Sequence, residues 1–172
     1  DTRADWDGAM DGPFLDYVKQ LKAQGKIRHI GMSTHNPAMA KKAVEGGLVE
    51  MILFSVNPAF DMHPATDDLD TYFDWENYQA DLGGIDPQRA ELYKLCEQND
   101  VGITVMKPYA GGRLFDAERS PFGVALTPVQ CLHYCLTRPG VAAVMAGYDT
   151  PEHVEQAAAY ETASQEERDY AS

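Results

Sequence analysis

Residues 102–114 read Gly-Ile-Thr-Val-Met-Lys-Pro-Tyr-Ala-Gly-Gly-Arg-Leu, an apolar, β-branched run that ends in a lysine, a proline and a glycine pair. The pattern predicts a buried strand whose carboxyl end opens into a tight loop. In parallel α/β proteins, ligands bind at that end of the strands. Three further apolar runs of this kind lie at 27–32, 49–56 and 141–146, and a helical pattern follows each strand.

Prolines and capping residues mark where the helical patterns begin. We expect helices over 13–24, from Pro37 to the Gly46-Gly47 pair, over 88–98, from Thr127-Pro128 to Pro139-Gly140 and from Thr150-Pro151 onward, with a short start in 164–172. One helix followed by four strand–helix units predicts a parallel sheet with right-handed crossovers. Four units are too few for a closed eight-stranded barrel. They fit half of such a barrel or an open, flavodoxin-like sheet, and no Gly-x-Gly-x-x-Gly motif supports a Rossmann fold.

Composition places the chain among ordinary globular domains and excludes several partners. The 172 residues suit one domain, 44% of them are hydrophobic, and the formal net charge is −13. Such a surface repels polyphosphate, so we expect no nucleic acid and no anionic membrane as partner. No signal peptide is visible, and no apolar run has the length of a membrane helix. The first residue is Asp1, which leads us to expect further sequence upstream.

The cysteines are Cys96, Cys131 and Cys135, and this odd, sparse set predicts a reducing compartment, the cytoplasm. Cys131 and Cys135 flank His133 in a predicted helix, which suggests a metal site. Because no second cluster matches them, we favour buried small side chains on one helix face and assign no metal.

The segment 57–85 interrupts the strand–helix rhythm. It contains the aspartates Asp61, Asp67, Asp68, Asp70, Asp74 and Asp81 and the aromatic residues Phe60, Tyr72, Phe73, Trp75 and Tyr78. We interpret residues 1–172 as one partial domain in which this irregular segment is an insertion. The alternating aspartate pattern of a calcium loop is absent, so we expect a solvated acidic loop whose aromatic residues form a partly ordered lid or a docking surface.

The sequence resembles the aldo/keto reductase family in three places. Residues 25–33, Gly-Lys-Ile-Arg-His-Ile-Gly-Met-Ser, are similar to the start of that family's fifth strand. Residues 103–114 resemble its seventh strand and loop, and 141–147 with the helix that follows resemble its eighth strand and last helix. The "Val-Met-Lys-Pro" and "Cys-Glu-Gln" segments resemble a bacterial branch that often continues into a ferredoxin-like cysteine cluster. This chain holds no such cluster, so no iron–sulfur site is assigned to it.

The resemblance implies the C-terminal half of a TIM (β/α)₈ barrel from a bacterial, cytoplasmic oxidoreductase. Such an enzyme reduces a small carbonyl substrate with NAD or NADP. The family's Asp, Tyr, Lys and His tetrad comes from the first four strands, which would precede Asp1. We therefore assign no catalytic residue here and expect the fragment alone to be inactive, because hydride transfer needs a proton donor on the carbonyl oxygen.

The resemblance also implies which residues cradle the cofactor. Ser33 and Asn36 resemble the pair that binds the carboxamide, with His35 intervening, and Asn57 matches the polar end of the sixth strand. The pyrophosphate loop corresponds to Lys107, Pro108, Gly111, Gly112 and Leu114. The adenosine end corresponds to Gly147, Tyr148, Thr150, Glu155 and Gln156.

Several of these residues also have a purely structural interpretation. Ser33, Asn36 and Thr150 fit helix caps, the glycine pair fits a turn, and His153 fits a solvated first-turn residue. Lys107 has no necessary structural duty at a strand end, which makes it the strongest candidate.

The cofactor preference follows from charge. No Lys or Arg lies between Pro139 and Glu167, where the family binds the 2′-phosphate of NADP with cations. Glu152 and Glu155 would repel that phosphate, so we expect NAD to be preferred.

Two other functions compete with carbonyl reduction. One is a non-catalytic half-barrel interaction module that self-associates through its open sheet edges. The other is a barrel enzyme of a different class that uses the Lys107 loop as a phosphate site. An upstream half with tyrosine and lysine at strand ends would favour the oxidoreductase.

Overall fold

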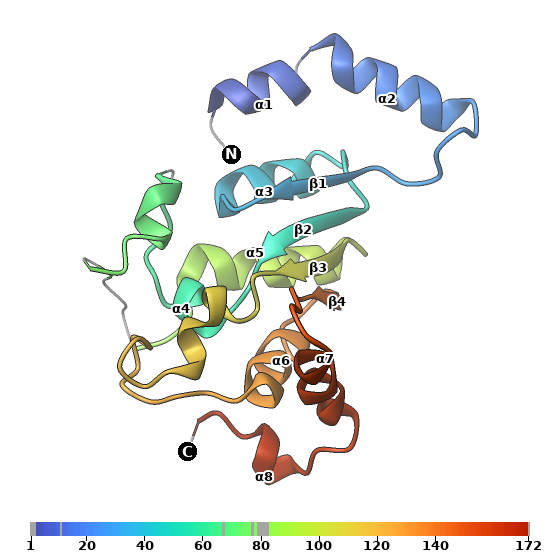
Figure 1. The fold of residues 1–172 in the computed structure, drawn as a ribbon. Helices are drawn as coiled ribbons and strands as arrows, with labels where there is room; N and C mark the ends of the chain where they lie inside the picture. Colours follow the sequence, from blue (N-terminus) through green and yellow to red (C-terminus); the bar gives the residue numbers. More distant parts are fainter. Residues whose placement is uncertain (1–2, 11, 67, 77, 79–82, 172) are drawn as a thin grey trace.

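The computed structural model describes residues 3–10, 12–66, 68–76, 78 and 83–171 (Figure 1). Its centre is a four-stranded parallel sheet in the order β1-β2-β3-β4. The strands are β1 (Gly31–Thr34), β2 (Met51–Ser55), β3 (Gly102–Met106) and β4 (Val141–Met145). This topology confirms the predicted parallel sheet of alternating strands and helices.

The α-helices of the described residues are α1 (Arg3–Met10), α2 (Pro13–Ala23), α3 (Pro37–Glu45), α4 (Pro58–Asp61), α5 (Pro87–Gln98), α6 (Pro128–Leu136), α7 (Pro151–Ala158) and α8 (Gln165–Arg168). Three 3₁₀ turns are η1 (Leu69–Tyr72), η2 (Ala110–Phe115) and η3 (Ala159–Glu161). Most of the α-helices begin with proline, because its fixed φ suits the first turn and its missing N–H is not needed there. Helix α1 was not predicted from the sequence.

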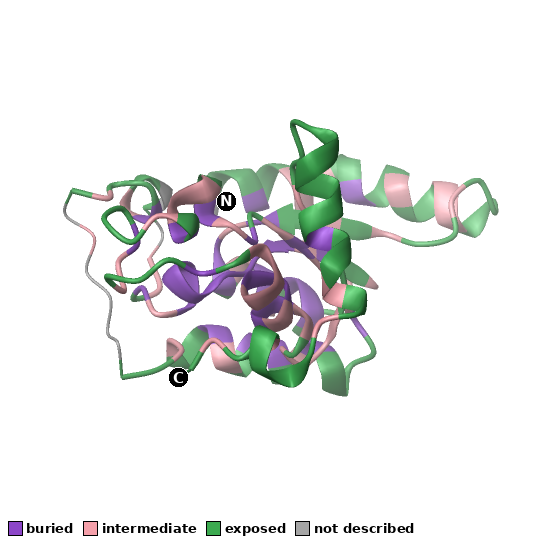
Figure 2. Ribbon diagram, turned by 60° about the horizontal axis from the view of Figure 1, so that its bottom comes forward, coloured by how far each residue is buried: buried purple, intermediate pink, exposed green. Residues whose placement is uncertain are grey.

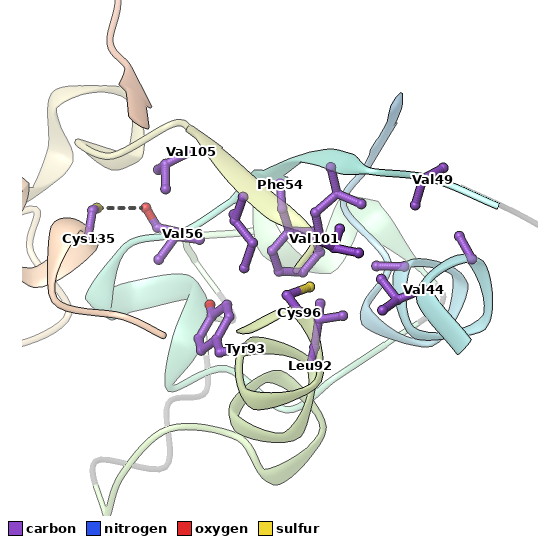
Figure 3. Close-up of a cluster of buried hydrophobic side chains, with 14 of the residues drawn as sticks. Val44, Val49, Phe54, Val56, Leu92, Tyr93, Cys96, Val101, Val105 and Cys135 are labelled. Carbon is purple, nitrogen blue, oxygen red and sulfur yellow. Dashed lines mark hydrogen bonds between the residues drawn. The ribbon is translucent and has the colours of Figure 1, made fainter. Parts of the chain in front are cut away.

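The main hydrophobic core lies on one face of the sheet. Ile52, Phe54, Ile103 and Val105 are fully buried there against α3, α5 and α6 (Figure 3). Alternate residues point to the opposite face, where Met51 is 41% exposed. Figure 2 shows the buried residues gathered around the sheet, with exposed helices around them. The sheet is thus covered well on one side and poorly on the other.

The first strand differs from the prediction. The apolar run at 27–32 predicted a strand there, but β1 starts at Gly31 and extends through Ser33 and Thr34. The carboxylate of Glu50 accepts hydrogen bonds from the Ile30 amide (3.2 Å) and from Lys22 Nζ, and it contacts His29 Nδ1 at 2.9 Å. The Ile30 carbonyl also accepts from the Glu50 amide at 2.9 Å, so main-chain contact with the neighbouring strand reaches Ile30, although the regular ladder begins at Gly31.

Asp61 corrects the expectation of a uniformly solvated acidic segment. It is completely buried in α4, where Oδ1 accepts from Arg89 Nε at 2.8 Å and from the Tyr93 hydroxyl at 2.5 Å. Its Oδ2 accepts from the Tyr134 hydroxyl at 2.9 Å. The guanidinium of Arg89 also donates to the Ser55 carbonyl. The other aspartates of the segment that the structure describes are exposed, and Asp67 and Asp81 lie outside the described residues.

The cysteines are free and buried, as favoured above. The Cys135 thiol donates to the Val56 carbonyl at 3.2 Å (Figure 3). Burial raises the pKa of Cys131 to about 12, so this thiol stays protonated at neutral pH. Among the described residues, no cluster of three or more His, Cys, Asp or Glu side chains could hold a metal ion. None of the described helices is both long and apolar enough to cross a bilayer.

We expect Asp61→Asn to lower the free energy of unfolding by about 3–5 kcal/mol, because it leaves the Arg89 guanidinium buried beside a neutral amide. Urea unfolding followed by circular dichroism measures this. Glu91→Gln is the control, since it removes the exposed 2.7 Å pair with Lys41 and should cost less than about 1 kcal/mol. Equal losses in the two variants would contradict the assigned role of Asp61.

Candidate functional site

A groove of about 630 Å³ lies at the carboxyl ends of β3 and β4. It is lined by the loop after β3, the turn after β4, the start of α7 and residues of the segment after β2. Seven of the residues predicted to bind cofactor line it: Lys107, Pro108, Gly111, Gly112, Gly147, Tyr148 and Gln156. The structure thus brings together the loop and turn that the sequence placed at neighbouring strand ends.

The loop after β3 turns sharply because four of its residues adopt left-handed backbone conformations. Lys107 has φ +58°, Ala110 +47°, Gly111 +69° and Gly112 +81°. The Lys107 carbonyl accepts from Asn57 Nδ2 at 2.9 Å and from the Ala110 amide at 3.1 Å. Left-handed φ costs energy for residues with a Cβ, so the Asn57 contact helps to hold the strained start of the loop.

The glycines leave the backbone open to a ligand. A Cβ built on Gly111, Gly112 or Gly147 would meet no other atom within 4 Å. Packing therefore does not explain why glycine stands at these positions, although the positive φ of the first two favours it. The open backbone allows a bulky anion such as a phosphate to approach closely.

The groove reverses the charge balance of the chain. Lys107 and Arg113 line it, against one carboxylate, Asp149, although acidic residues outnumber Lys and Arg by 27 to 14 overall. The His153 ring accepts a long 3.4 Å hydrogen bond from the Asp149 amide, so this exposed first-turn residue also shapes the groove. Sequence reasoning did not single out Arg113, which is visible only as a cation beside the glycine pair.

An aromatic wall was also missed as part of the site. Phe60, Phe73 and Trp75, from the segment after β2, line the groove together with Tyr109 and Phe115. Burial raises the pKa of Tyr109, so its hydroxyl stays protonated. The composition of 57–85 indicated an aromatic lid or docking surface, but not which cavity it faces.

The remaining predicted residues do not line this groove, and Ser33 lines a second pocket beside α1 and α2 instead. Ser33 is exposed at the end of β1, and Leu114 is fully buried beneath the loop. Asn57 is fully buried, and its Oδ1 accepts from the Phe60 amide at 2.8 Å while its Nδ2 holds Lys107. Glu155 is exposed on α7.

Two predicted residues cap helices, as their structural interpretation suggested. Asn36 accepts from the Ala38 and Met39 amides at 2.9 and 3.2 Å, and Thr150 accepts from the His153 amide at 3.3 Å. A cap does not exclude a ligand contact, because each side chain has further hydrogen-bonding capacity.

Next to Asn36, burial and then the charge of Lys107 lower the pKa of His35, so this ring is neutral at pH 7.

Comparison with known proteins identifies relatives of this fold. A sequence profile of the aldo/keto reductase family matches residues 4–129. The aldo-keto reductase AKR11C1 from Bacillus halodurans, in its holo form, superposes with a TM-score of 0.62 at 22% identity, over 94% of this chain and 56% of that one. Its apo form gives 0.60 at 21% identity, with the same coverage. The thermostable aldo-keto reductase Tm1743, solved with the inhibitor epalrestat, gives 0.54 at 18% identity, over 90% of this chain and 51% of that one.

The chain therefore spans about half the length of these structures, whose full folds are TIM barrels. No curated protein sequence matches it. The structural likeness, at these identities, concerns the fold.

We expect Asn57→Ala to lower the free energy of unfolding by about 3 kcal/mol, because it removes a helix cap and a buried bond to the Lys107 loop. It should also speed hydrogen exchange selectively in residues 107–115. Asn99→Ala is the matched control, since Asn99 Nδ2 donates to the Leu95 carbonyl at 2.9 Å in an exposed position. If exchange in 107–115 stayed at the wild-type rate, the Asn57 contact would not be what holds this loop.

Proposed function

This chain belongs to the aldo/keto reductase family, and we propose that it forms the cofactor-holding half of an NAD(P)-dependent carbonyl reductase. The observation that carries the proposal is the groove beside Lys107. It combines an open glycine backbone with two permanent cations at the carboxyl ends of parallel strands. This is the chemistry that a dinucleotide pyrophosphate requires.

Different residues of the site are proposed to bind the pyrophosphate, the adenosine and the nicotinamide of the cofactor. The backbone at Gly111 and Gly112 and the ammonium of Lys107 would hold the pyrophosphate. The start of α7, with Gly147, Thr150 and Gln156, would hold the adenosine end. Ser33, Asn36 and Asn57, at the ends of β1 and β2, are proposed for the nicotinamide end, and Leu114 and Tyr148 would support the loop and the groove wall. The reduced nicotinamide supplies the hydride when bound.

The proton donor for the carbonyl oxygen is not assigned within these residues. We propose that it comes from a part of the barrel that this chain does not contain. This is supported by the matched structures, which extend well beyond the half that the chain covers. A bacterial, cytoplasmic protein is proposed as well, which the free thiols and a bacterial relative support.

Isothermal titration of the full-length protein with NAD⁺ tests the cofactor site. We expect Lys107→Met to weaken binding about tenfold, because a charge-assisted contact to phosphate is lost. Lys94→Met, which removes an exposed lysine on α5, should leave the dissociation constant unchanged. Absence of NAD⁺ and NADP⁺ binding by the wild-type protein would overturn the proposed function.

We further expect NAD⁺ to bind at least about fivefold more tightly than NADP⁺. Hydrogen bonding to the backbone amide at the start of α7, and then to Thr150, holds the pKa of Glu152 below its usual range. Glu152 therefore stays charged at neutral pH and repels a 2′-phosphate at that end of the groove. Because the repelling form is the ionised one, the preference should shrink as the pH falls toward the pKa of Glu152. Titrations in which NADP⁺ binds more tightly at pH 7 would contradict this.

The 172 residues expressed alone should reduce no carbonyl compound and should self-associate. Met51 and Met145, on the poorly covered face and on the edge strand β4, are 41% and 61% exposed, and both unpaired sheet edges invite further pairing. Size-exclusion chromatography with light scattering measures the association. A stable monomer would contradict it and would also count against an interaction module.

A further inference from the structure

Both permanent cations of the groove lie over aromatic rings of the segment that follows β2. Lys107 Nζ lies 5.1 Å from the centre of the Phe73 ring, and the Arg113 guanidinium carbon lies 4.8 Å from the centre of the Trp75 ring. All four residues line the cavity together with the glycine pair of the same loop. Segments about 30 to 40 residues apart in sequence thus meet at the loop that faces the ligand.

A ring orients a cation without neutralising it. The quadrupole of an aromatic face attracts a positive charge, whereas a carboxylate partner would cancel that charge and compete with an anionic ligand. Among the described residues, the ion pairs involve other cations, and neither Lys107 nor Arg113 takes part in one. In a chain of net charge −13, this arrangement keeps two full charges available at the groove.

A second hydrophobic cluster lies under this segment; it includes Phe60, Tyr72 and Leu114, and Trp75 and Tyr78 pack against it. Phe60, which is 1% exposed, contacts Phe73 edge-to-face at 5.7 Å and stacks on Trp75 at 6.2 Å. Tyr78 also stacks on Trp75, with 5.2 Å between the ring centres, and its hydroxyl donates to the Ala59 carbonyl. Trp75 is therefore held within a column of rings, and its orientation is set before any ligand arrives.

We propose that Phe73 and Trp75 are positioning residues, which hold Lys107 and Arg113 over the groove to bind the paired phosphates of a dinucleotide. This rests on the proposed function and deepens it, because it assigns Arg113 to the anion and gives the aromatic segment a role. Long cationic side chains lose much rotamer freedom when they bind. Rings that restrict them beforehand reduce that loss, so removal of a ring should weaken binding of phosphate-bearing ligands specifically.

The test compares ligands with and without phosphate on the full-length protein. ADP-ribose carries the pyrophosphate, and adenosine lacks it. We expect Trp75→Leu to weaken ADP-ribose binding about fivefold by titration calorimetry and to leave adenosine binding unchanged. Trp75→Phe, which keeps a ring under Arg113, should restore most of the affinity. Phe73→Leu should behave like Trp75→Leu, and its ring is 44% exposed, so folding tolerates the change well.

Tyr160→Leu is the matched control. It removes a ring that lies 4.6 Å from the Arg168 guanidinium, at a position outside the lining of the groove, and should leave both ligands unaffected. If Trp75→Leu fails to fold, Phe73→Leu decides the question.

The outcomes separate this inference from the proposed function. Equal losses for adenosine and ADP-ribose in the ring variants would show a merely structural role, and unchanged binding of both would show none. Either result overturns the inference while NAD⁺ binding still supports a reductase. If the wild-type protein binds neither NAD⁺ nor ADP-ribose, the proposed function fails together with it.

Discussion

One carboxylate, that of Asp61, joins the helices behind the sheet to the end of a central strand. It accepts hydrogen bonds from Arg89 and Tyr93 of α5 and from Tyr134 of α6, while Arg89 reaches the Ser55 carbonyl at the end of β2. The Asp61 amide donates to the Asn57 carbonyl at 3.0 Å. Since the Asn57 side chain holds the Lys107 loop, the position of the groove wall depends on this buried network. A buried carboxylate is costly unless its hydrogen-bond partners are all in position, so this network favours one arrangement of these elements.

The molecule uses its arginines in two opposite ways. Arg89 is fully buried and paired with a carboxylate, so its charge serves the fold and is unavailable to a ligand. Arg113 lies at the groove over Trp75, where its charge is oriented but not cancelled. The same side-chain type thus stabilises the interior at Arg89 and, in the proposed site, binds an anion at Arg113. The difference comes from the partner and the burial, not from the residue type.

Local patterns predicted the architecture well, because apolar runs, prolines and caps act over a few residues. The parallel order of strands and most helix starts follow from such signals. Long-range partners were not predictable in the same way. Nothing near Asp61 indicates that its cation lies 28 residues away, and nothing near Ile30 indicates that its amide bonds the Glu50 side chain. Likewise, the sequence identified the glycine loop but could not indicate that Phe73 and Trp75 face it.

The order of the strands has a consequence for how the chain folds. Neighbours in the sheet are also neighbours in sequence. The connection from Thr34 to Met51 is short, so β1-α3-β2 can assemble locally, whereas the connection from Met106 to Val141 is about twice as long. The β2–β3 connection, with α4, η1 and α5, is the longest of the three. We therefore expect the pairing of β2 with β3 to be slow, and the contacts of the buried Asp61 with α5 and α6 to form late. Because the residues that line the groove follow β2, β3 and β4, we expect the groove to form last.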